Sequence, residues 1–277
     1  MKKEEGTFVG AGGTDIYWQS WIPDTIRAVC IICHGLGEHS GRYEHVALKL
    51  GDEDIASFAL DHRGHGKSKG RRGHVNSFGD YVSDVDSLRC RVEERFEDIP
   101  KFLIGHSMGG LIAANYAIVH GNGLSGLVLS SAALRVDVDA SPVKLALGKV
   151  FSRLLPWITM SNELDPKMIS HDEKVVELYE NDPLVHDRVS ARWFTEFMAA
   201  MDTAHEGARQ ISFPVLVMQS GEDALVAPRG AGEFFDRLAV EDKTLKHWEG
   251  FYHEMFNEVE REKPLSFMID WIEERLS

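Results

Sequence analysis

Three things are scarce in this chain of 277 residues: cysteine, positive charge and long apolar runs. The 3 cysteines are too few for a disulfide framework and agree with a reducing compartment. The 30 Lys and Arg residues stand against 44 Asp and Glu, a net charge of −14, so no basic stripe is available to neutralise nucleic acid phosphates. No run is long enough to span a bilayer, and no apolar signal core follows the N-terminal lysines, which predicts a cytoplasmic protein.

Signals for a metal or a cofactor are missing too. The Gly-x-Gly-x-x-Gly of residues 121–126 precedes an apolar run instead of following one and opening a helix, which argues against a dinucleotide site. His62 and His65 have no third ligand at a recognisable spacing. We therefore predict no metal and no cofactor.

Apolar, strand-like runs alternate with helical patterns over most of the chain. Strands are expected at residues 15–22, 28–33, 57–60, 101–104, 127–129, 215–219 and 244–248, and helices around 43–50, 81–92, 234–238 and 265–276. Val/Ile/Leu-rich strands separated by helices predict an α/β fold with a mainly parallel sheet that is covered on both faces. Cys30 and Cys33 then point to opposite faces of one strand, and Cys90 lies in a helical pattern. We interpret all three cysteines as buried structural residues.

One interval interrupts the alternation. From Leu134 to Gly207 no clear strand is evident, and helical stretches follow one another around residues 143–158, 174–179 and 191–201. The first stretch has a wide apolar face, which suits packing on the core as well as a lid over an apolar acyl pocket. We predict a helical cap at 134–207, inserted into a core that is formed by residues 1–133 and 208–277.

The most informative stretch runs from Phe102 to Leu111. An apolar, strand-like run leads into Gly105-His106-Ser107-Met108-Gly109, and an Ala-rich helical segment follows. This Gly-x-Ser-x-Gly context is typical of a sharp turn that holds a serine hydroxyl above the end of a sheet. Glycine is expected at 105 and 109 because the strained turn leaves no room for Cβ atoms. The motif alone is a hypothesis, and its weight depends on whether the chain supplies partners for Ser107.

Conspicuous polar clusters directly follow the expected strands. They are His34–Glu38, Asp61–Gly66, Ser107, Glu222-Asp223 and His253. Because the carboxyl ends of parallel strands meet at one edge of a sheet, and open α/β sheets bind ligands there, we expect these side chains to converge.

The chemistry of a serine nucleophile assigns roles within these clusters. The serine needs a base, and the base needs a third group that orients it. His253, after the last strand, is the expected base, and Asp223 is the expected orienting acid, with Glu222 as a weaker second choice. The order Ser, Asp, His along the chain is that of α/β-hydrolases. The expected oxyanion donors are the backbone N–H groups of Met108 and Leu36.

Motifs spread over nearly the whole chain carry a family resemblance. They are His34–Tyr43, Asp61–Ser68, Gly105–Gly110, Asn181–Leu184 and Gly250–His253. In these motifs the chain resembles the monoacylglycerol lipases, in the monoglyceride lipase/lysophospholipase group of the α/β-hydrolase superfamily. The resemblance implies an eight-stranded sheet, a cap over a tunnel for one acyl chain, and ester hydrolysis through Ser107, Asp223 and His253 without metal or cofactor.

The same resemblance implies residues that bind the glycerol hydroxyls, namely Arg42, His106 and Tyr179. Each has a structural alternative: a surface ion pair for Arg42, bracing of the turn for His106, and packing within the cap for Tyr179. The resemblance also implies transient contact with membranes or micelles through the cap, where the net charge of −14 gives no electrostatic help on anionic lipid.

We therefore predict a serine carboxylic-ester hydrolase that acts on a small lipid ester and cleaves monoacylglycerol to fatty acid and glycerol through an acyl-enzyme. A lysophospholipase or a broad short-chain carboxylesterase would use the same triad. A non-catalytic hydrolase-like binding protein would have no need of Ser107, Asp223 and His253 together. An α/β-fold aminopeptidase needs acidic groups for the substrate amine, and the sequence shows no acidic cluster clearly placed for that role. The oligomeric state is not predicted.

Overall fold

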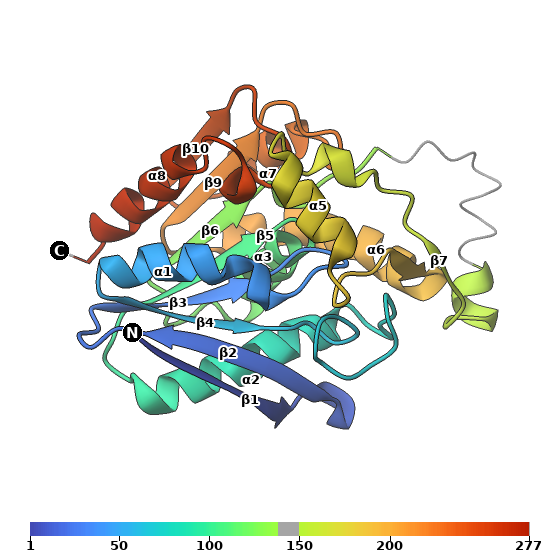
Figure 1. Cartoon of the computed structure of the whole chain (residues 1–277), viewed down its shortest axis with the longest axis horizontal. Coiled ribbons are helices and arrows are strands. Elements are labelled where there is room, and N and C mark those ends of the chain that lie inside the picture. Colours follow the sequence, from blue (N-terminus) through green and yellow to red (C-terminus); the bar gives the residue numbers. More distant parts are fainter. Residues whose placement is uncertain (138–149, 277) are drawn as a thin grey trace.

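The computed structural model describes residues 1–137 and 150–276 and has an eight-stranded sheet at its centre (Figure 1). The strand order across the sheet is β1-β2-β4-β3-β5-β6-β9-β10. The strands are β1 (Lys2–Val9), β2 (Asp15–Ile22), β3 (Ala28–Cys33), β4 (Ile55–Leu60), β5 (Lys101–His106), β6 (Gly126–Ser130), β9 (Val215–Ser220) and β10 (Lys243–Trp248). Every strand expected from the sequence is present.

The strand directions confirm a mainly parallel sheet. The strands from β4 to β10 in the sheet order are parallel to one another, and β2 runs antiparallel to both β1 and β4. Strand β1 is an addition to the expected set. Its sequence, Lys-Lys-Glu-Glu-Gly-Thr-Phe-Val, has little apolar alternation, yet it pairs with β2 along its whole length, from Lys2 opposite Ile22 to Val9 opposite Asp15. An edge strand that is largely exposed does not need an apolar pattern.

Helices cover both faces of the sheet, as expected (Figure 1). Outside the insertion they are α1 (Glu44–Asp52), α2 (Gly79–Arg95), α3 (Met108–His120), α7 (Arg229–Arg237) and α8 (Glu262–Glu273). Side chains alternate along β5, so that Leu103 packs with α2, α3 and α7 on one face and Phe102 packs with α1 and α8 on the other. Short 3₁₀ helices lie at Ala11–Gly13, Ser40–Tyr43, Pro166–Met168, Ala208–Gln210 and Met255–Asn257.

The cysteines test a detail of this packing. Cys30 and Cys33 are buried on opposite faces of β3, as expected. Cys90 is exposed, so the prediction that it is buried is wrong. The buried face of α2 contains Leu88 and Val92, and a residue two positions beyond Leu88 lies on the other side of the helix.

The segment between β6 and β9 contains helices, as predicted, together with a short sheet. Its elements are β7 (Thr159–Ser161), α5 (Glu173–Asn181), β8 (Arg188–Ser190) and α6 (Ala191–Gly207), with a short helical stretch at residues 150–154. Strands β7 and β8 pair antiparallel, so the expectation of no strand here is wrong. Three residues are too few to produce a recognisable period. Residues 143–149 of the helix expected around 143–158 lie outside the described residues, and the described remainder is helical at 150–154 only.

The two ends of this insertion pack differently. Ala200 and Ala204 of α6 are buried against α3, and the side-chain Nδ2 of Asn115 on α3 donates to the Ala200 carbonyl at 3.1 Å. In contrast, Leu154 and Trp157 are 69% and 49% exposed, so this part of the expected apolar face is not packed on the core. Within the described ranges, no helix is both long enough and apolar enough to cross a membrane.

Candidate active site

Ser107 occupies the turn between β5 and α3. Its φ of 54° lies in the left-handed region that non-glycine residues seldom adopt, and the Ala133 N–H holds the turn by donating to the Ser107 carbonyl at 2.9 Å. A Cβ atom on Gly105 would lie 2.4 Å from the Gly109 carbonyl oxygen, and one on Gly109 would lie 2.2 Å from the Cys33 carbonyl oxygen. The expected need for glycine at both positions of the motif is confirmed.

His253 and Asp223 meet although they are far apart in the chain. His253 follows β10, and its Nδ1 lies 2.8 Å from Oδ2 of Asp223, in the loop after β9. Oδ1 of Asp223 accepts the backbone N–H groups of Leu225 and Val226, both at 3.0 Å, and Gln219 Nε2 donates to Oδ2 at 3.2 Å. Both side chains of the pair are buried. Asp223 is thus held in place by its own loop. Because its contact with His253 uses Nδ1, the other ring nitrogen, Nε2, is free to bind a group in the cavity.

Charge couples these two side chains. Burial alone would lower the pKa of His253, but the Asp223 carboxylate raises that pKa above its ordinary value. Burial would likewise raise the pKa of Asp223, whereas His253 and the backbone N–H donors lower it. Glu222, the second choice for the orienting acid, is exposed to solvent. Asp223 is therefore the carboxylate that is placed to orient His253.

The two expected oxyanion donors lie at the same edge of the sheet as Ser107. Leu36 and Met108 line one cavity together with Ser107 and His253. A Cβ atom on Gly109 would lie within 2.4 Å of the carbonyl oxygens of both Cys33 and His34, so the start of α3 is in close contact with the end of β3. This contact brings the first residue of α3, Met108, next to the loop that carries Leu36.

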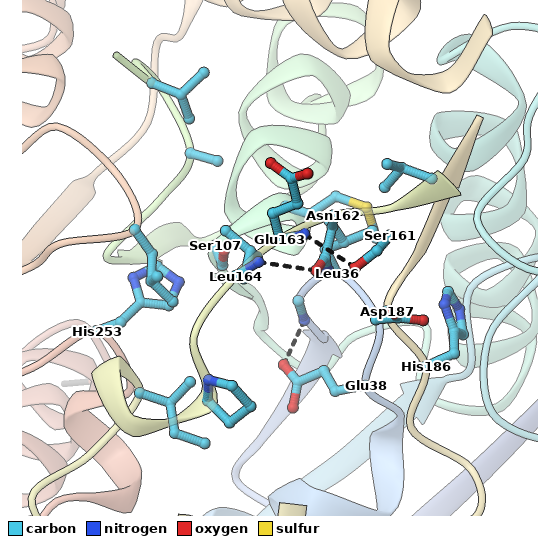
Figure 2. A pocket seen from close by; sticks show the side chains of 18 of the residues that line it. Leu36, Glu38, Ser107, Ser161, Asn162, Glu163, Leu164, His186, Asp187 and His253 are labelled. Atoms are coloured by element: carbon cyan, nitrogen blue, oxygen red, sulfur yellow. Dashed lines mark hydrogen bonds between the residues drawn. The ribbon is translucent and has the colours of Figure 1, made fainter. Parts of the chain in front are cut away.

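The cavity has a volume of about 1130 Å³ and is walled largely by the insertion (Figure 2). Its apolar lining residues include Met160, Leu164, Ile169, Val189, Phe194 and Phe197. Figure 2 shows Leu164 and its neighbour Glu163 on the wall of the cavity, with Ser107 and Leu36 in the same view.

Acidic side chains also line this cavity, and the described lining residues include no lysine and no arginine. The carboxylates are those of Glu38, Asp137, Glu163, Asp165, Glu180, Asp182, Asp187 and Glu254. Glu163, Asp165 and Glu180 make no ion pair among the described residues. The sequence alone did not indicate that residues distant in the chain would place carboxylates around one cavity.

His106 lines the cavity and its ring lies beside that of His253, with 4.8 Å between the ring centroids. Its Nδ1 is 3.1 Å from the Ser130 carbonyl oxygen, and because a carbonyl can only accept, Nδ1 carries the proton and Nε2 is left as an acceptor. Burial, with a smaller contribution from His253, lowers the pKa of His106 to about 4. At neutral pH this uncharged ring can accept a hydrogen bond from a ligand hydroxyl.

Arg42 and Tyr179 are placed differently from each other. The guanidinium of Arg42 donates to Glu38 at 2.6 Å and, through both terminal nitrogens, to Glu254 at 2.7 Å, and it is not among the residues that line the cavity. Tyr179 of α5 lines the cavity, and its ring lies 4.8 Å from the Arg42 guanidinium carbon. The ion pair considered for Arg42 is therefore present, but it is buried instead of exposed.

Sequence reasoning placed Glu38 in a polar cluster at this edge without a role, and it missed Glu254. Both are buried and both bind Arg42, one from the loop after β3 and the other from the position after His253. A carboxylate directly after a Gly-x-Gly and one next to the expected base were the available signals. Their ligand atoms lie within 4.8 Å of those of His106, the spacing of a potential metal site. Because the Arg42 guanidinium already balances both carboxylates, we assign no metal to this group.

The Asp-x-Arg-Gly-x-Gly motif supports the site from outside the cavity. Oδ1 of Asp61 accepts the Ser40 backbone N–H at 2.8 Å, and Oδ2 accepts the Lys67 N–H at 2.7 Å. Arg63 pairs with Asp84 of α2 at 2.7 Å. Both side chains follow β4 at the expected edge and neither lines the cavity, because Asp61 braces the neighbouring loop after β3 and Arg63 binds α2.

The fold and this site define a class, the serine hydrolases with the α/β-hydrolase fold. Within that class, the chain belongs to the Hydrolase_4 family, described as serine aminopeptidase, S33, whose family model matches residues 24–260.

Individual relatives agree with this assignment. The chain is 36% identical to the monoacylglycerol lipase of Mycolicibacterium smegmatis over 98% of this chain and 97% of that protein. It is 33% identical to phospholipase YtpA of Bacillus subtilis, over 88% of this chain and 94% of that protein. The crystal structure of Paleococcus ferrophilus monoacylglycerol lipase superposes with a TM-score of 0.83 at 34% identity, covering 99% of this chain and 100% of that one. The resemblance and the fold expected from the sequence are confirmed.

Proposed function

We propose that this protein is a serine carboxylic-ester hydrolase that cleaves monoacylglycerol to a fatty acid and glycerol. The observation that carries the proposal is a single cavity lined by Ser107, His253 and an apolar wall, with Asp223 hydrogen-bonded to His253. The similarity to two monoacylglycerol lipases supports the same substrate class.

The reaction would proceed through an acyl-enzyme. Ser107 Oγ attacks the ester carbonyl carbon while Nε2 of His253 takes the hydroxyl proton, and Asp223 holds the His253 tautomer that makes this transfer feasible. The N–H groups of Leu36 and Met108 bind the oxyanion, and His253 returns the proton to the departing glycerol oxygen. A water molecule, activated by His253 in the same way, then releases the fatty acid.

We assign the acyl chain to the apolar wall and the glycerol to the polar end of the cavity. Residues 134–207 act as the cap that supplies Met160, Leu164, Val189 and Phe194 to the wall. At the other end, the free Nε2 of His106 accepts a glycerol hydroxyl, and Tyr179 lines the same cavity. Arg42 contributes by holding Tyr179 and the two neighbouring glutamates in place.

The charge of the cavity separates monoacylglycerol from anionic lysophospholipids. The described lining residues include no lysine or arginine, and the carboxylates of Glu163, Asp165 and Glu180 make no ion pair among the described residues, whereas a phosphate headgroup needs Lys, Arg or aligned N–H donors. At equal acyl length, kcat/KM for a lysophospholipid with net negative charge should be at least about tenfold below that for monoacylglycerol. A broad short-chain esterase would instead prefer butyrate esters to monoolein.

A serine variant tests the mechanism. Ser107→Ala should keep the fold and lose hydrolysis of monoolein and of nitrophenyl esters, whereas Ser83→Ala, on the exposed face of α2, should leave both rates unchanged. Labelling by a fluorophosphonate should occur in the wild type and in Ser83→Ala only. A Ser107→Ala protein that hydrolyses either ester at the wild-type rate contradicts the proposal, and an unlabelled wild type would indicate a binding protein.

Aminopeptidase activity is a second candidate, favoured by the carboxylates of Glu163, Asp165 and Glu180, which are not ion-paired among the described residues, and by the description of the family. A free substrate amine would bind such groups as an ammonium ion. Assay of aminoacyl and N-acetylated aminoacyl nitroanilides separates the two functions. Cleavage of the free-amine substrate faster than monoolein would favour the peptidase.

We further propose that the enzyme works in the cytoplasm and meets its substrate at lipid surfaces through the cap. Leu154, Met160 and Leu178 are each 60% or more exposed, which suits brief contact with a micelle or bilayer. Co-sedimentation with neutral vesicles should be lost when Leu154 and Leu178 are both replaced by Ser. Unchanged sedimentation of this variant contradicts the contact.

A further inference from the structure

We propose that Glu38 is a positioning residue for the oxyanion hole, because its carboxylate binds the Gly35 N–H and so holds the residue whose carbonyl peptide carries the Leu36 N–H. The inference rests on the proposed ester hydrolysis, in which Leu36 is one of two oxyanion donors. Glu38 is buried, and it lies two residues after Leu36.

The first link is a short hydrogen bond. The Gly35 N–H donates to Oε1 of Glu38 at 2.6 Å. Gly35 is next to the reacting groups, since a Cβ atom there would lie 3.3 Å from Cβ of Ser107 and 3.4 Å from the His106 ring. A glycine has access to many backbone conformations, so without an anchor the Gly35–Leu36 peptide could rotate and turn its N–H away from the substrate.

The second link holds the other side of the same residue. His34 accepts the His62 backbone N–H through Nε2 at 2.9 Å, so its proton is on Nδ1, which donates to the Gly35 carbonyl oxygen at 2.8 Å. That carbonyl and the Leu36 N–H belong to one planar peptide and point in opposite directions. With Gly35 held at its N–H by Glu38 and at its carbonyl by His34, the direction of the Leu36 N–H is set.

The third link keeps Glu38 charged and in place. Its Oε2 accepts Arg42 at 2.6 Å, and Arg42 in turn binds Glu254, the neighbour of His253. Burial would raise the pKa of Glu38, but Arg42 and nearby histidines lower it to about 2. The network therefore joins the loop of the oxyanion donor to the loop of the base.

A pair of substrates isolates this role. Sulfur is a weak hydrogen-bond acceptor, so a thionoester gains much less from the oxyanion donors than the matching oxoester. Nitrophenyl esters are suitable because they have no glycerol hydroxyls to contact the polar end of the cavity. Glu38→Ala should lower kcat for the oxoester at least about tenfold, part of the 10²–10³ that one such donor contributes, with KM within about threefold. The ratio of oxoester to thionoester kcat should fall by a similar factor.

A matched control acts on the same carboxylate. Tyr43→Phe removes the other hydrogen bond to Oε1, at 2.7 Å, and leaves the Gly35 bond intact, so the rate ratio should stay within about threefold of the wild type. Glu38→Gln retains an oxygen for Gly35 but loses the charge, and should give an intermediate ratio. If Glu38→Ala does not fold, the rate ratio of Glu38→Gln tests the positioning role instead.

The outcomes are distinguishable. A wild type that hydrolyses no ester would overturn the proposed function and this inference with it. An active wild type whose oxoester-to-thionoester ratio is unchanged in the folded Glu38 variants would overturn the inference alone. An equal loss on both substrates would place Glu38 in general support of the site and would also overturn it.

Discussion

Replacement of Asp223 by Asn is the sharpest test of the proposed catalytic unit. In the wild type, Oδ1 of Asp223 accepts the backbone N–H groups of Leu225 and Val226, and Oδ2 faces Nδ1 of His253 at 2.8 Å. An Asn side chain would keep its oxygen on the two N–H donors and turn its NH₂ toward His253. A donor would then face Nδ1, which drives the ring proton to Nε2, and the ring could no longer take the proton of Ser107.

The size of the effect follows from that change of tautomer. In a serine triad the same replacement costs about 10⁴ in kcat, or about 5 kcal/mol of transition-state stabilisation. The pH profile should change as well. Activity requires neutral His253, so in the wild type it is lost as the pH falls through a pKa that lies above the ordinary value. Without the Asp223 charge, burial remains as the main influence on His253, and the residual activity should persist to lower pH.

Initial rates of nitrophenyl ester hydrolysis, measured from pH 5 to pH 9, give both the loss in kcat and the shift of the pH profile. Glu222→Gln is the matched control, because it removes an exposed charge next to Asp223 without touching His253, and it should leave the rate and the profile unchanged. An Asp223→Asn protein with kcat within tenfold of the wild type would refute the assignment. So would an acid limb that moves to higher pH.

Three further predictions concern stability. Gly109→Ala would place a Cβ atom 2.2 Å from the Cys33 carbonyl and should destabilise the protein by about 3 kcal/mol, measured by urea denaturation; a loss below about 1 kcal/mol contradicts the close contact. Asn115→Ala removes the 3.1 Å hydrogen bond to Ala200 and should cost about 1 kcal/mol, a fall in Tm of about 2–4 °C by calorimetry. Glu38 has a pKa lowered from 4.5 to about 2, so its stabilising effect is complete above pH 4.5 and is lost as the pH falls toward 2. Urea midpoints between pH 5 and pH 3 should therefore fall more steeply in the wild type than in Glu38→Gln, and parallel curves would contradict this.

Much of the fold could be predicted because buried strands and helices have recognisable patterns of apolar residues in the sequence. Strands such as β3 and β9, buried on both faces, are continuous apolar runs with clear ends. Strand β1 could not be found in this way, since an exposed edge strand places few demands on its side chains. Strands β7 and β8 are too short for any period, and their pairing depends on the tertiary position of the segments that flank them.

The residues of the site also differ in how well the sequence predicts them. Ser107, Asp223 and His253 carry signals because each follows a strand and because their order is specific, and the structure places His253 and Asp223 in contact. For the Glu38–Arg42–Glu254 network the sequence offers only the positions of its carboxylates, one after a Gly-x-Gly and one next to the expected base, and these do not indicate that both bind Arg42. The network forms between two loops that are more than two hundred residues apart, so only the packing of the whole sheet brings its members together.

Helix α6 both lines the cavity and packs on the core, which limits the substitutions by which this chain can change its substrate preference. The first turns of the helix contribute Trp193 and Phe197 to the cavity, whereas Ala200 and Ala204 further along lie against α3. To change the acyl-chain preference by introducing residues from a related protein, the substitutions should therefore be made within residues 150–190, and the end of α6 should be kept unchanged. Substitutions among the cavity-lining residues there would alter the wall of the cavity without disturbing the register of α6 on α3. The part of the chain that is free to adopt new substrates is thus shorter than the insertion itself.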